Sequence, residues 1–318
     1  MFEDKRIVFF GTPEFAAYIL DFIIKKKFNV VGVITAADKP AGRGLKLTYS
    51  PVKIKALELQ IPLLQPEKLK DPDFLSQLTK FNADIQLVVA FKMLPEQVWN
   101  LPPLGTINLH TSLLPQYRGA APMHWAIING ENETGLTTFQ LQHEIDTGKI
   151  LLQEKISIDI KDTVGCLHDK MINKGAQLVV DTLIGIFNKT IIPKAQTEIK
   201  AGDKLKAAPK IKNEDCFINW QQPVVLVYNF IRGLNPFPGA ITKTTSGELF
   251  KIFDIQYELS NHEFEFGLVY YDAPKKTIKI ACQGGFILVS AWQPQGKKKM
   301  LVLDYLNGNQ PPVKFILN

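Results

Sequence analysis

The first half of the chain alternates strand-like and helix-like segments, and this alternation constrains the fold more than any other feature. A buried-strand pattern over Arg6–Phe10 ends at Gly11-Thr12-Pro13, and residues 14–25 then carry apolar side chains at helical spacing. The same patterns predict a helix over 52–59 and further strands over 30–34, 84–90 and 106–110. Such alternation predicts a mostly parallel sheet that is covered on both faces. Sheets of this kind bind ligands at the carboxyl ends of their strands.

The pattern changes near Lys189. Residues 190–207 show no sustained periodicity and are predicted to form a linker. Beyond them come a short helix over 223–232, a Pro-rich turn, and strand-like pieces at 249–253, 266–271, 277–282 and 285–291. Closely spaced strands with Gly and Pro turns predict a small antiparallel barrel, whose topology the periodicity leaves open. We therefore predict an α/β domain over 1–189 and a smaller β domain over 208–318.

The charge and the cysteine content indicate which kind of partner and which cellular compartment to expect. The net charge of +6 and the pI near 9.0 favour an anionic partner, although surplus lysine can serve solubility alone. Cys166, Cys216 and Cys282 are far apart and odd in number, which favours a reducing compartment and argues against a disulfide framework or a cysteine metal site. The chain has no apolar run of membrane length, and a strand begins at Arg6, so we expect a cytoplasmic protein that needs no membrane. We also expect a monomer.

Gly11-Thr12-Pro13 occupies the turn where a dinucleotide-binding fold would carry Gly-x-Gly-x-x-Gly. Only the first of the three glycines is present, so the backbone lacks the close approach that a pyrophosphate requires. A tight strand-to-helix turn is the preferred interpretation, and a nucleotide-dependent oxidoreductase loses its main support.

The polar residues Asn108 and His110 end the predicted strand 106–110. Because they are two positions apart on a strand, their side chains lie on one face. Asp146-Thr147-Gly148 offers a carboxylate after a further apolar stretch. An amide and an imidazole can donate hydrogen bonds to the oxyanion of an acyl transfer, and a carboxylate can direct protons. Taken singly, each residue could be a strand-end cap, a buried polar group or a turn residue. Asp-Thr-Gly also occurs in aspartic proteases, but those need two copies in a mainly β chain.

The run from Asn108 to Gly119, together with Asp146-Thr147-Gly148, resembles the signature of 10-formyltetrahydrofolate-dependent formyltransferases. The resemblance extends from Arg6 nearly to the C-terminus. It implies a Rossmann-like N-terminal domain, an OB-like C-terminal barrel, 10-formyltetrahydrofolate as formyl donor, and no metal. It also implies that Asn108 is an oxyanion donor, that His110 is a second donor in its protonated form, and that Asp146 supports the charge on His110 and relays the proton of the amine.

The same resemblance implies a folate pocket. Ser112, Leu113, Leu114 and Pro115 would line it through backbone groups, although they could equally form an ordinary turn with two buried leucines. Family members usually carry Ala-Tyr-Gly before the catalytic strand, whereas this chain has Ala90-Phe91-Lys92 and one residue fewer. The local shape of the pocket therefore differs, and Phe91 is expected to supply an apolar wall. Arg118 could bind an anionic group or hold its loop in place, and the sequence leaves both roles open.

A long connection over 36–51 interrupts the alternation and is rich in glycine and basic residues. Long loops in compact domains are usually functional or disordered, so a flexible solvated loop is the alternative. In the family members that act on initiator methionyl-tRNA, the corresponding insertion reaches the acceptor end of the tRNA. Arg43 would then probe the first base pair, and Lys39 and Lys46 would meet phosphates.

Lys297 and Lys298 belong to a second basic cluster. It is either a solvated face or a track for the tRNA backbone. We predict an enzyme that transfers a formyl group to the α-amino group of methionyl-initiator tRNA. The alternatives are a formyltransferase that acts on an amino sugar or another small amine, and a non-catalytic tRNA-binding protein.

Overall fold

The structure is a computed structural model that describes residues 2, 4–41, 46–198, 204–272 and 277–316. The chain divides into two compact units. The first comprises Met1–Gly119, Gly135–Ile156 and Asp169–Ala207, and the second comprises Ala120–Thr134, Ser157–His168 and Ala208–Asn318. Two short segments from within residues 1–189 therefore belong to the second unit, and the segment predicted as a linker belongs to the first.

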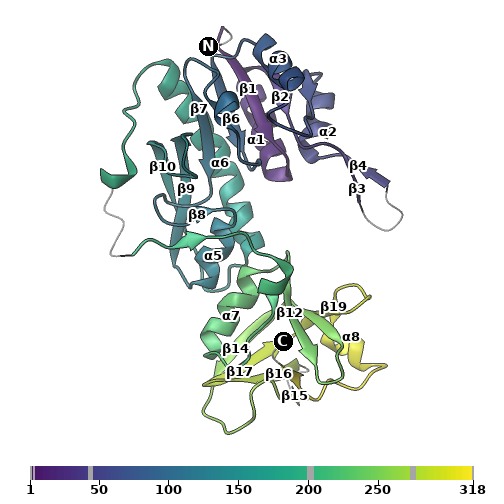
Figure 1. Cartoon of the computed structure of the whole chain (residues 1–318). Helices are drawn as coiled ribbons and strands as arrows, with labels where there is room; N and C mark the ends of the chain where they lie inside the picture. The colour runs from purple at the N-terminus through teal and green to yellow at the C-terminus, as the bar shows by residue number, and fades with distance from the viewer. Residues whose placement is uncertain (1, 3, 42–45, 199–203, 273–276, 317–318) are drawn as a thin grey trace. The chain divides into compact units, whose positions relative to one another are not determined.

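The first unit is built on a 7-stranded sheet with the order β10-β9-β7-β6-β1-β2-β5 (Figure 1). The strands are β1 (Arg6–Gly11), β2 (Asn29–Ile34), β5 (Leu63–Leu64), β6 (Ile85–Val89), β7 (Thr106–His110), β9 (Glu133–Gln140) and β10 (Ile150–Ser157). β5, β2, β1, β6 and β7 run parallel to their neighbours in this series, while β9 pairs with β7 in the antiparallel sense. The predicted mostly parallel sheet is confirmed.

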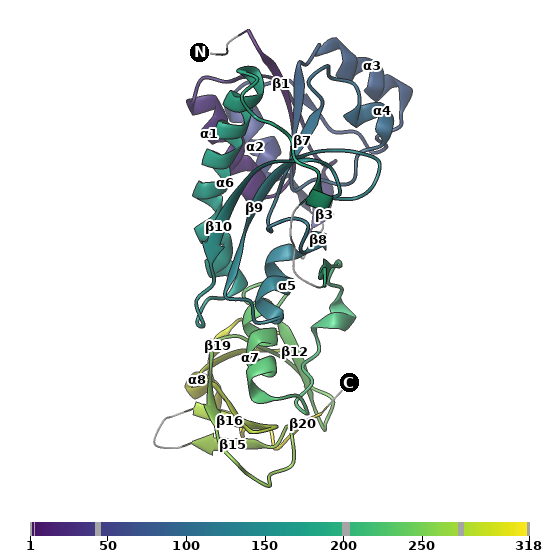
Figure 2. The same cartoon turned by 90° about the vertical axis from the view of Figure 1, so that its left-hand side faces the viewer.

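Helices cover both faces of this sheet (Figures 1 and 2). α1 (Glu14–Lys25), α2 (Pro51–Glu58) and α6 (Val164–Phe187) lie on one face, and α3 (Pro72–Lys80) and α4 (Glu96–Trp99) lie on the other. α6 approaches closely because a Cβ at Gly175 would stand 3.2 Å from the Leu109 side chain. On the opposite face, Phe74 and Leu78 pack in one apolar cluster with strand residues that include Phe10.

The long connection predicted over 36–51 contains an antiparallel hairpin, β3 (Lys39–Ala41) and β4 (Lys46–Thr48). Figure 1 shows it projecting from the first unit. Strands of three residues are too short for a periodic pattern to reveal, so the sequence predicted only a loop here. Ser50 then caps α2 by accepting a hydrogen bond from the Lys53 backbone at 3.0 Å.

The second unit carries two antiparallel sheets, a 5-stranded one with the order β19-β18-β13-β12-β20 and a 4-stranded one with the order β14-β17-β16-β15. Their strands are β12 (Ala240–Thr244), β13 (Leu249–Ile252), β14 (Ile255–Leu259), β15 (Val269–Asp272), β16 (Thr277–Cys282), β17 (Gly285–Val289), β18 (Ala291–Pro294), β19 (Met300–Leu301) and β20 (Phe315–Ile316). Trp220, Trp292, Phe250 and Phe315 fill the core between them. The predicted fold class, α/β followed by a smaller β domain, is confirmed.

Helices complete the second unit. They are α5 (Pro122–Ile128), α7 (Val224–Gly233) and α8 (Val302–Leu306). A Cβ at Gly233 of α7 would stand 2.6 Å from the Ile128 side chain of α5, so the two helices pack closely. Across the described residues, no helix is both long and apolar enough to cross a membrane.

Candidate active site

The candidate site is built around the carboxyl end of β7. Asn108 lies opposite Phe139 of β9, and His110 lies opposite Thr137. Alternation along the strand places both polar side chains on one face, as predicted. Asn108 is half-buried and His110 is 6% exposed. Within the described part of the chain, the Asn108 side chain hydrogen-bonds to no other residue, so its amide N–H is left to donate to a ligand.

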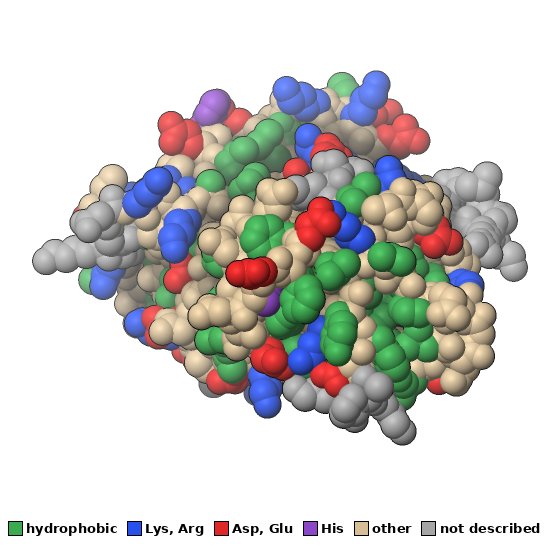
Figure 3. Space-filling view, turned by 90° about the horizontal axis from the view of Figure 1, so that it is seen from below, with side chains coloured by type: hydrophobic (Ala, Val, Ile, Leu, Met, Phe, Trp, Pro, Cys, Tyr) green, Lys and Arg blue, Asp and Glu red, His purple; other side chains and the backbone are tan. Residues whose placement is uncertain are grey.

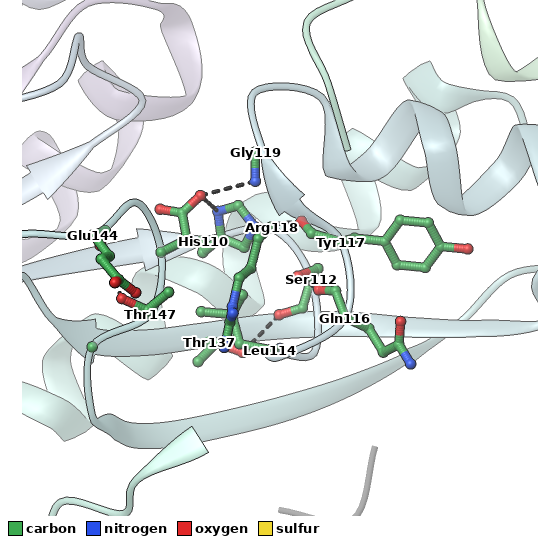
Figure 4. Close-up of polar contacts among 12 residues, drawn as sticks. His110, Ser112, Leu114, Gln116, Tyr117, Arg118, Gly119, Thr137, Glu144 and Thr147 are labelled. Carbon is green, nitrogen blue, oxygen red and sulfur yellow. Dashed lines mark hydrogen bonds and ion pairs between the residues drawn. The ribbon is translucent and has the colours of Figure 1, made fainter. Parts of the chain in front are cut away.

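His110 sits between two hydrogen-bond acceptors (Figure 4). Its Nε2 is 2.9 Å from the Tyr117 carbonyl oxygen, and its Nδ1 is 4.0 Å from Oδ2 of Asp146. Because a carbonyl oxygen accepts hydrogen bonds, Nε2 is the ring nitrogen placed to donate to Tyr117. The 4.0 Å separation between Nδ1 and Asp146 exceeds hydrogen-bond length, which leaves Nδ1 open to a ligand oxygen or a water.

Asp146 reaches His110 from the turn between β9 and β10. It adopts a positive φ of 53°, and its Oδ2 accepts a hydrogen bond from the Gly119 backbone N–H at 2.9 Å. Gly148 is required in this turn because a Cβ there would stand 1.7 Å from the Gln140 carbonyl oxygen. The predicted convergence of Asp146 on His110 is present in the structure.

The loop over 112–115 is held tightly by polar contacts. The Ser112 hydroxyl donates to the Gln116 carbonyl at 2.6 Å, and the Thr137 hydroxyl donates to the Ser112 carbonyl at 2.6 Å. The Leu114 backbone N–H donates to the Thr137 hydroxyl, and the Leu114 carbonyl accepts from the Gln153 amide. Both backbone groups of Leu114 are therefore already engaged within the protein.

The side chains of that loop face mostly inward. Ser112, Leu114 and Pro115 are buried and Leu113 is half-buried, and Leu114 packs against Phe139 and Ile150. Any contact of this segment with a folate therefore involves its remaining backbone groups, or Leu113. The folate role of these four residues stays a prediction.

Phe91 follows β6 at the carboxyl edge of the sheet. Its ring centroid is 5.6 Å from that of Phe10 on the neighbouring strand β1. The order of the sheet reverses between β1 and β6, and such a reversal opens the crevice where α/β sheets bind ligands. Met93, two residues further on, is 74% exposed. Phe91 thus lies at the carboxyl edge beside this reversal, and its role as an apolar wall of a folate pocket is still a prediction.

The predicted tRNA-binding residues fall into two groups. Lys39 is exposed on β3, and Lys46 belongs to β4 through its backbone pairing with Ala41. Arg43 lies outside the described residues. In the second unit, Lys297 and Lys298 are exposed, and the Lys297 ammonium lies 5.5 Å from the Tyr305 ring centroid.

Basic side chains do not gather into one continuous patch on the face drawn in Figure 3, where they lie among acidic and apolar ones. Next to Lys297 and Lys298 in the sequence, Lys299 forms an ion pair with Asp254 at 2.9 Å. The tRNA-binding roles remain predictions. The described residues also contain no group of three or more His, Cys, Asp or Glu side chains that could hold a metal ion.

Sequence reasoning missed several residues that hold the site together. Thr137 anchors the loop over 112–115, the Tyr117 carbonyl orients His110, and Gln196 bonds to the turn that carries Asp146. A backbone acceptor leaves no trace in the side-chain pattern, and Gln196 lies in a segment without periodicity. Arg118, whose role the sequence left open, donates to Gln196 through Nε at 3.0 Å and Nη2 at 2.6 Å.

A doubly wound sheet that carries an amide and an imidazole near one strand end, with a carboxylate from a neighbouring turn, has the groups that an acyl transfer needs. The family models named "Formyl transferase" and "Formyl transferase, C-terminal domain" match residues 5–183 and 210–310. The chain belongs to the formyltransferase family, which confirms the family resemblance predicted from the sequence.

Particular relatives narrow the comparison. The methionyl-tRNA formyltransferase of Bacteroides thetaiotaomicron is 51% identical over 310 residues, which cover 96% of each chain. That of Flavobacterium johnsoniae is 49% identical over 309 residues and 96% of each chain.

Two solved structures share the fold. HypX from Aquifex aeolicus, in complex with tetrahydrofolic acid, has a TM-score of 0.63 at 16% identity, covering 95% of this chain and 47% of its own. The sugar 3N-formyl transferase WlaRD has a TM-score of 0.64 at 21% identity, covering 92% of this chain and 99% of its own.

Proposed function

We propose that this enzyme transfers the formyl group of 10-formyltetrahydrofolate to the α-amino group of methionine on initiator tRNA. The product would be N-formylmethionyl-tRNA. The observation that carries the proposal is the 51% identity to a methionyl-tRNA formyltransferase, which extends over 96% of both chains and includes the second unit. The sugar 3N-formyl transferase, by contrast, is only 21% identical to this chain, so its likeness supports the shared fold and not the substrate.

The chemistry follows from the groups around β7. The neutral amine attacks the formyl carbon, so a C–N bond forms and negative charge develops on the formyl oxygen. The amide N–H of Asn108 and the positive charge of His110 stabilise that oxygen. The ammonium proton passes to Asp146, through water, and the bond from the formyl carbon to N10 of the folate then breaks. N10 receives that proton from Asp146, through water, as tetrahydrofolate leaves, so Asp146 returns to its carboxylate form and atoms and charges balance.

The roles of Asp146 and His110 are coupled. Their 4.0 Å separation places the carboxylate of Asp146 beside the His110 ring. The distance also leaves the carboxylate room to take the proton of the amine through one water molecule. This arrangement supports Asp146 as the proton acceptor.

Recognition of the tRNA is assigned to basic residues outside this centre. Lys39, Arg43 and Lys46 on the hairpin segment would contact the acceptor end, and Lys297 and Lys298 would contact the backbone of the tRNA. Such contacts release counterions, so binding weakens steeply with salt. We further propose that the protein acts as a monomer in the cytoplasm.

The test incubates the purified protein with 10-formyltetrahydrofolate and methionyl-initiator tRNA, and measures N-formylmethionine after hydrolysis of the ester. A nucleotide-linked amino sugar is assayed in parallel. We expect formylmethionine to form with a KM for tRNA that rises steeply with salt. A higher kcat/KM for the amino sugar, with no formylation of the tRNA, would refute the proposal.

A further inference from the structure

Gln196 opens the short 3-10 helix η1 (Gln196–Glu198), inside the segment that the sequence predicted to be a linker. Its side chain is 5% exposed, whereas Thr197 and Glu198 beside it are exposed. A glutamine buried in a connecting segment is unusual, since long polar side chains normally stay in solvent. Its surroundings explain why it is inside.

All four hydrogen bonds of this side-chain amide are formed with residues of the candidate site. Its Oε1 accepts from Nε and Nη2 of Arg118, at 3.0 and 2.6 Å. Its Nε2 donates to the backbone carbonyls of Asp146 and Gly148, at 2.8 and 2.9 Å. One side chain therefore joins the strand segment β8 (Arg118–Gly119) to the turn that carries Asp146.

These contacts close a ring around Asp146. The carboxylate of Asp146 accepts from the Gly119 N–H at 2.9 Å, while its own carbonyl is held by Gln196. Asp146 adopts a positive φ of 53°, a conformation that a non-glycine residue keeps only when its surroundings hold it there. The backbone of Asp146 is thus fixed from one side and its side chain from the other.

The same connecting segment also supports His110. The Lys206 carbonyl accepts from the Tyr117 backbone N–H at 2.7 Å, and the Tyr117 carbonyl is the acceptor for His110 Nε2. The Gln116 side chain adds two further bonds, from its Nε2 to the Lys204 carbonyl and from the Lys206 N–H to its Oε1. Residues on both sides of the undescribed stretch 199–203 therefore lie against the site.

We propose that Gln196 is a positioning residue for formyl transfer, which holds the Asp146 carboxylate at its place beside His110. The proposal rests on the proposed function and adds to it a requirement for one residue outside the substrate-contacting set. Of the two roles open for Arg118, its bonds to Gln196 support that of holding the loop.

Two substitutions separate the contribution of the Gln196 oxygen from that of its amide nitrogen. Gln196→Glu keeps the acceptor for Arg118 but presents a carboxylate oxygen to the carbonyls of Asp146 and Gly148. Gln196→Met keeps the length of the side chain and removes all four bonds. Glu198→Gln, on the same short helix and exposed, is the matched control.

The experiment measures kcat and the KM of each substrate for these variants, alone and combined with Asp146→Asn. Misplacing a catalytic group by about 1 Å can cost a factor of about 100, so we expect kcat to fall about 10- to 100-fold in Gln196→Glu and Gln196→Met. KM for folate and for tRNA should change less than about threefold. In the Asp146→Asn background the same substitutions should lower kcat less than about twofold, because the group that Gln196 positions is already disabled.

Three outcomes would overturn the proposal. The first is a kcat within about twofold of wild type in both variants, and the second is an equal loss of kcat with and without Asp146→Asn. The third is loss of folding in both variants, which would assign Gln196 a role in stability alone. A wild-type protein that does not formylate methionyl-tRNA defeats the proposed function itself. Unchanged variants of an active wild type defeat only the positioning role.

Discussion

At the scale of single residues, the site depends on how each polar group divides its hydrogen bonds between the protein and a ligand. Thr137 and Leu114 form their hydrogen bonds within the protein, and the Tyr117 carbonyl holds His110. The Asn108 side chain forms no hydrogen bond within the described part of the chain. This division distinguishes residues that shape the site from those left to act on a substrate.

Asp146 is the residue whose chemistry is easiest to isolate. In Asp146→Asn the side chain can still accept from the Gly119 N–H, but it loses its negative charge beside His110 and the capacity to take a proton. We expect kcat to fall about 100- to 10,000-fold, the usual contribution of general acid–base catalysis. Steady-state kinetics should show little change in KM for folate.

Glu144→Gln is the control for that experiment, because Glu144 is an exposed carboxylate on the same turn. It should retain wild-type kcat. Equal losses in the two variants would mean that the charge of the turn matters and not the position of Asp146.

The sequence predicted part of this arrangement. The spacing of Asn108 and His110 on one strand was sufficient to place them on one face. No local pattern brings Asp146 to the same point, and that prediction came from the family resemblance. The Tyr117 carbonyl and Gln196 were missed because one is a backbone atom and the other lies in an aperiodic segment.

At the scale of elements, the hairpin β3–β4 is attached to the sheet by a compact polar cluster. The Asp38 carboxylate pairs with the Lys53 ammonium and accepts from the Gln65 amide at 2.9 Å, and Gln65 also donates to the Ala36 carbonyl. The Lys53 ammonium lies 3.9 Å from the Tyr49 ring centroid. These contacts join the two ends of the hairpin segment to the strand β5 side of the sheet.

The hydrogen bonds from Lys53 and Gln65 hold the pKa of Asp38 below its ordinary value of 3.8. A carboxyl group with a lowered pKa in the folded state stabilises that state above pH 3.8 and loses the contribution as the pH falls through the folded-state pKa. We therefore predict that Asp38→Asn loosens the hairpin at neutral pH and raises KM for tRNA several-fold, with kcat nearly unchanged. Hydrogen exchange of the hairpin amides should be faster in the variant.

The pH dependence of hydrogen exchange distinguishes the loss of the Asp38 ion pair from a general loss of stability. The difference in exchange between wild type and Asp38→Asn should shrink as the pH falls below 3.8, because the wild-type carboxyl becomes neutral too. A difference of equal size at low and neutral pH would argue against the ion pair as the cause. Glu96→Gln, an exposed substitution on α4, should leave KM for tRNA unchanged.

Long elements with strong periodicity were predicted closely, and short ones were not. Helix 14–25 and strand 106–110 match α1 and β7 to the residue. The hairpin β3–β4 escaped because each of its strands has only three residues. Its existence depends on the polar cluster at its base, whose members are up to 29 positions apart, and no local pattern reports such contacts.

At the scale of the whole molecule, the second unit is assembled from three separate stretches of chain. Arg232 on α7 is 3% exposed and donates from Nη1 to the carbonyls of Asp159 and Asp162, at 3.3 and 2.8 Å. The Tyr228 hydroxyl donates to the Ile160 carbonyl at 3.1 Å. Burial lowers the pKa of the Arg232 guanidinium, which shows how far this group is removed from water.

The sequence predicts a separate domain over residues 208–318, and these contacts provide a way to test that prediction. A fragment comprising residues 208–318 lacks α5 and the segment Ser157–His168, so Nη1 of Arg232 and the Tyr228 hydroxyl lose these carbonyl acceptors. A buried group without its partner costs about 1–3 kcal/mol, and more when it is charged. We predict that this fragment unfolds at a clearly lower temperature than the second unit of the intact chain, as measured by circular dichroism. Cooperative unfolding at the same temperature would show that the bounds drawn from the sequence suffice.

We propose that Asn108, His110 and Asp146 together carry out formyl transfer. The most direct test is the single-turnover rate of formyl transfer to methionyl-initiator tRNA by Asn108→Ala, with both substrates saturating. Removal of one oxyanion donor should slow this step about 100- to 1,000-fold and leave the affinity for the folate nearly unchanged. A rate within about threefold of wild type would contradict the assignment of Asn108, and with it the view that this end of β7 is where the reaction occurs.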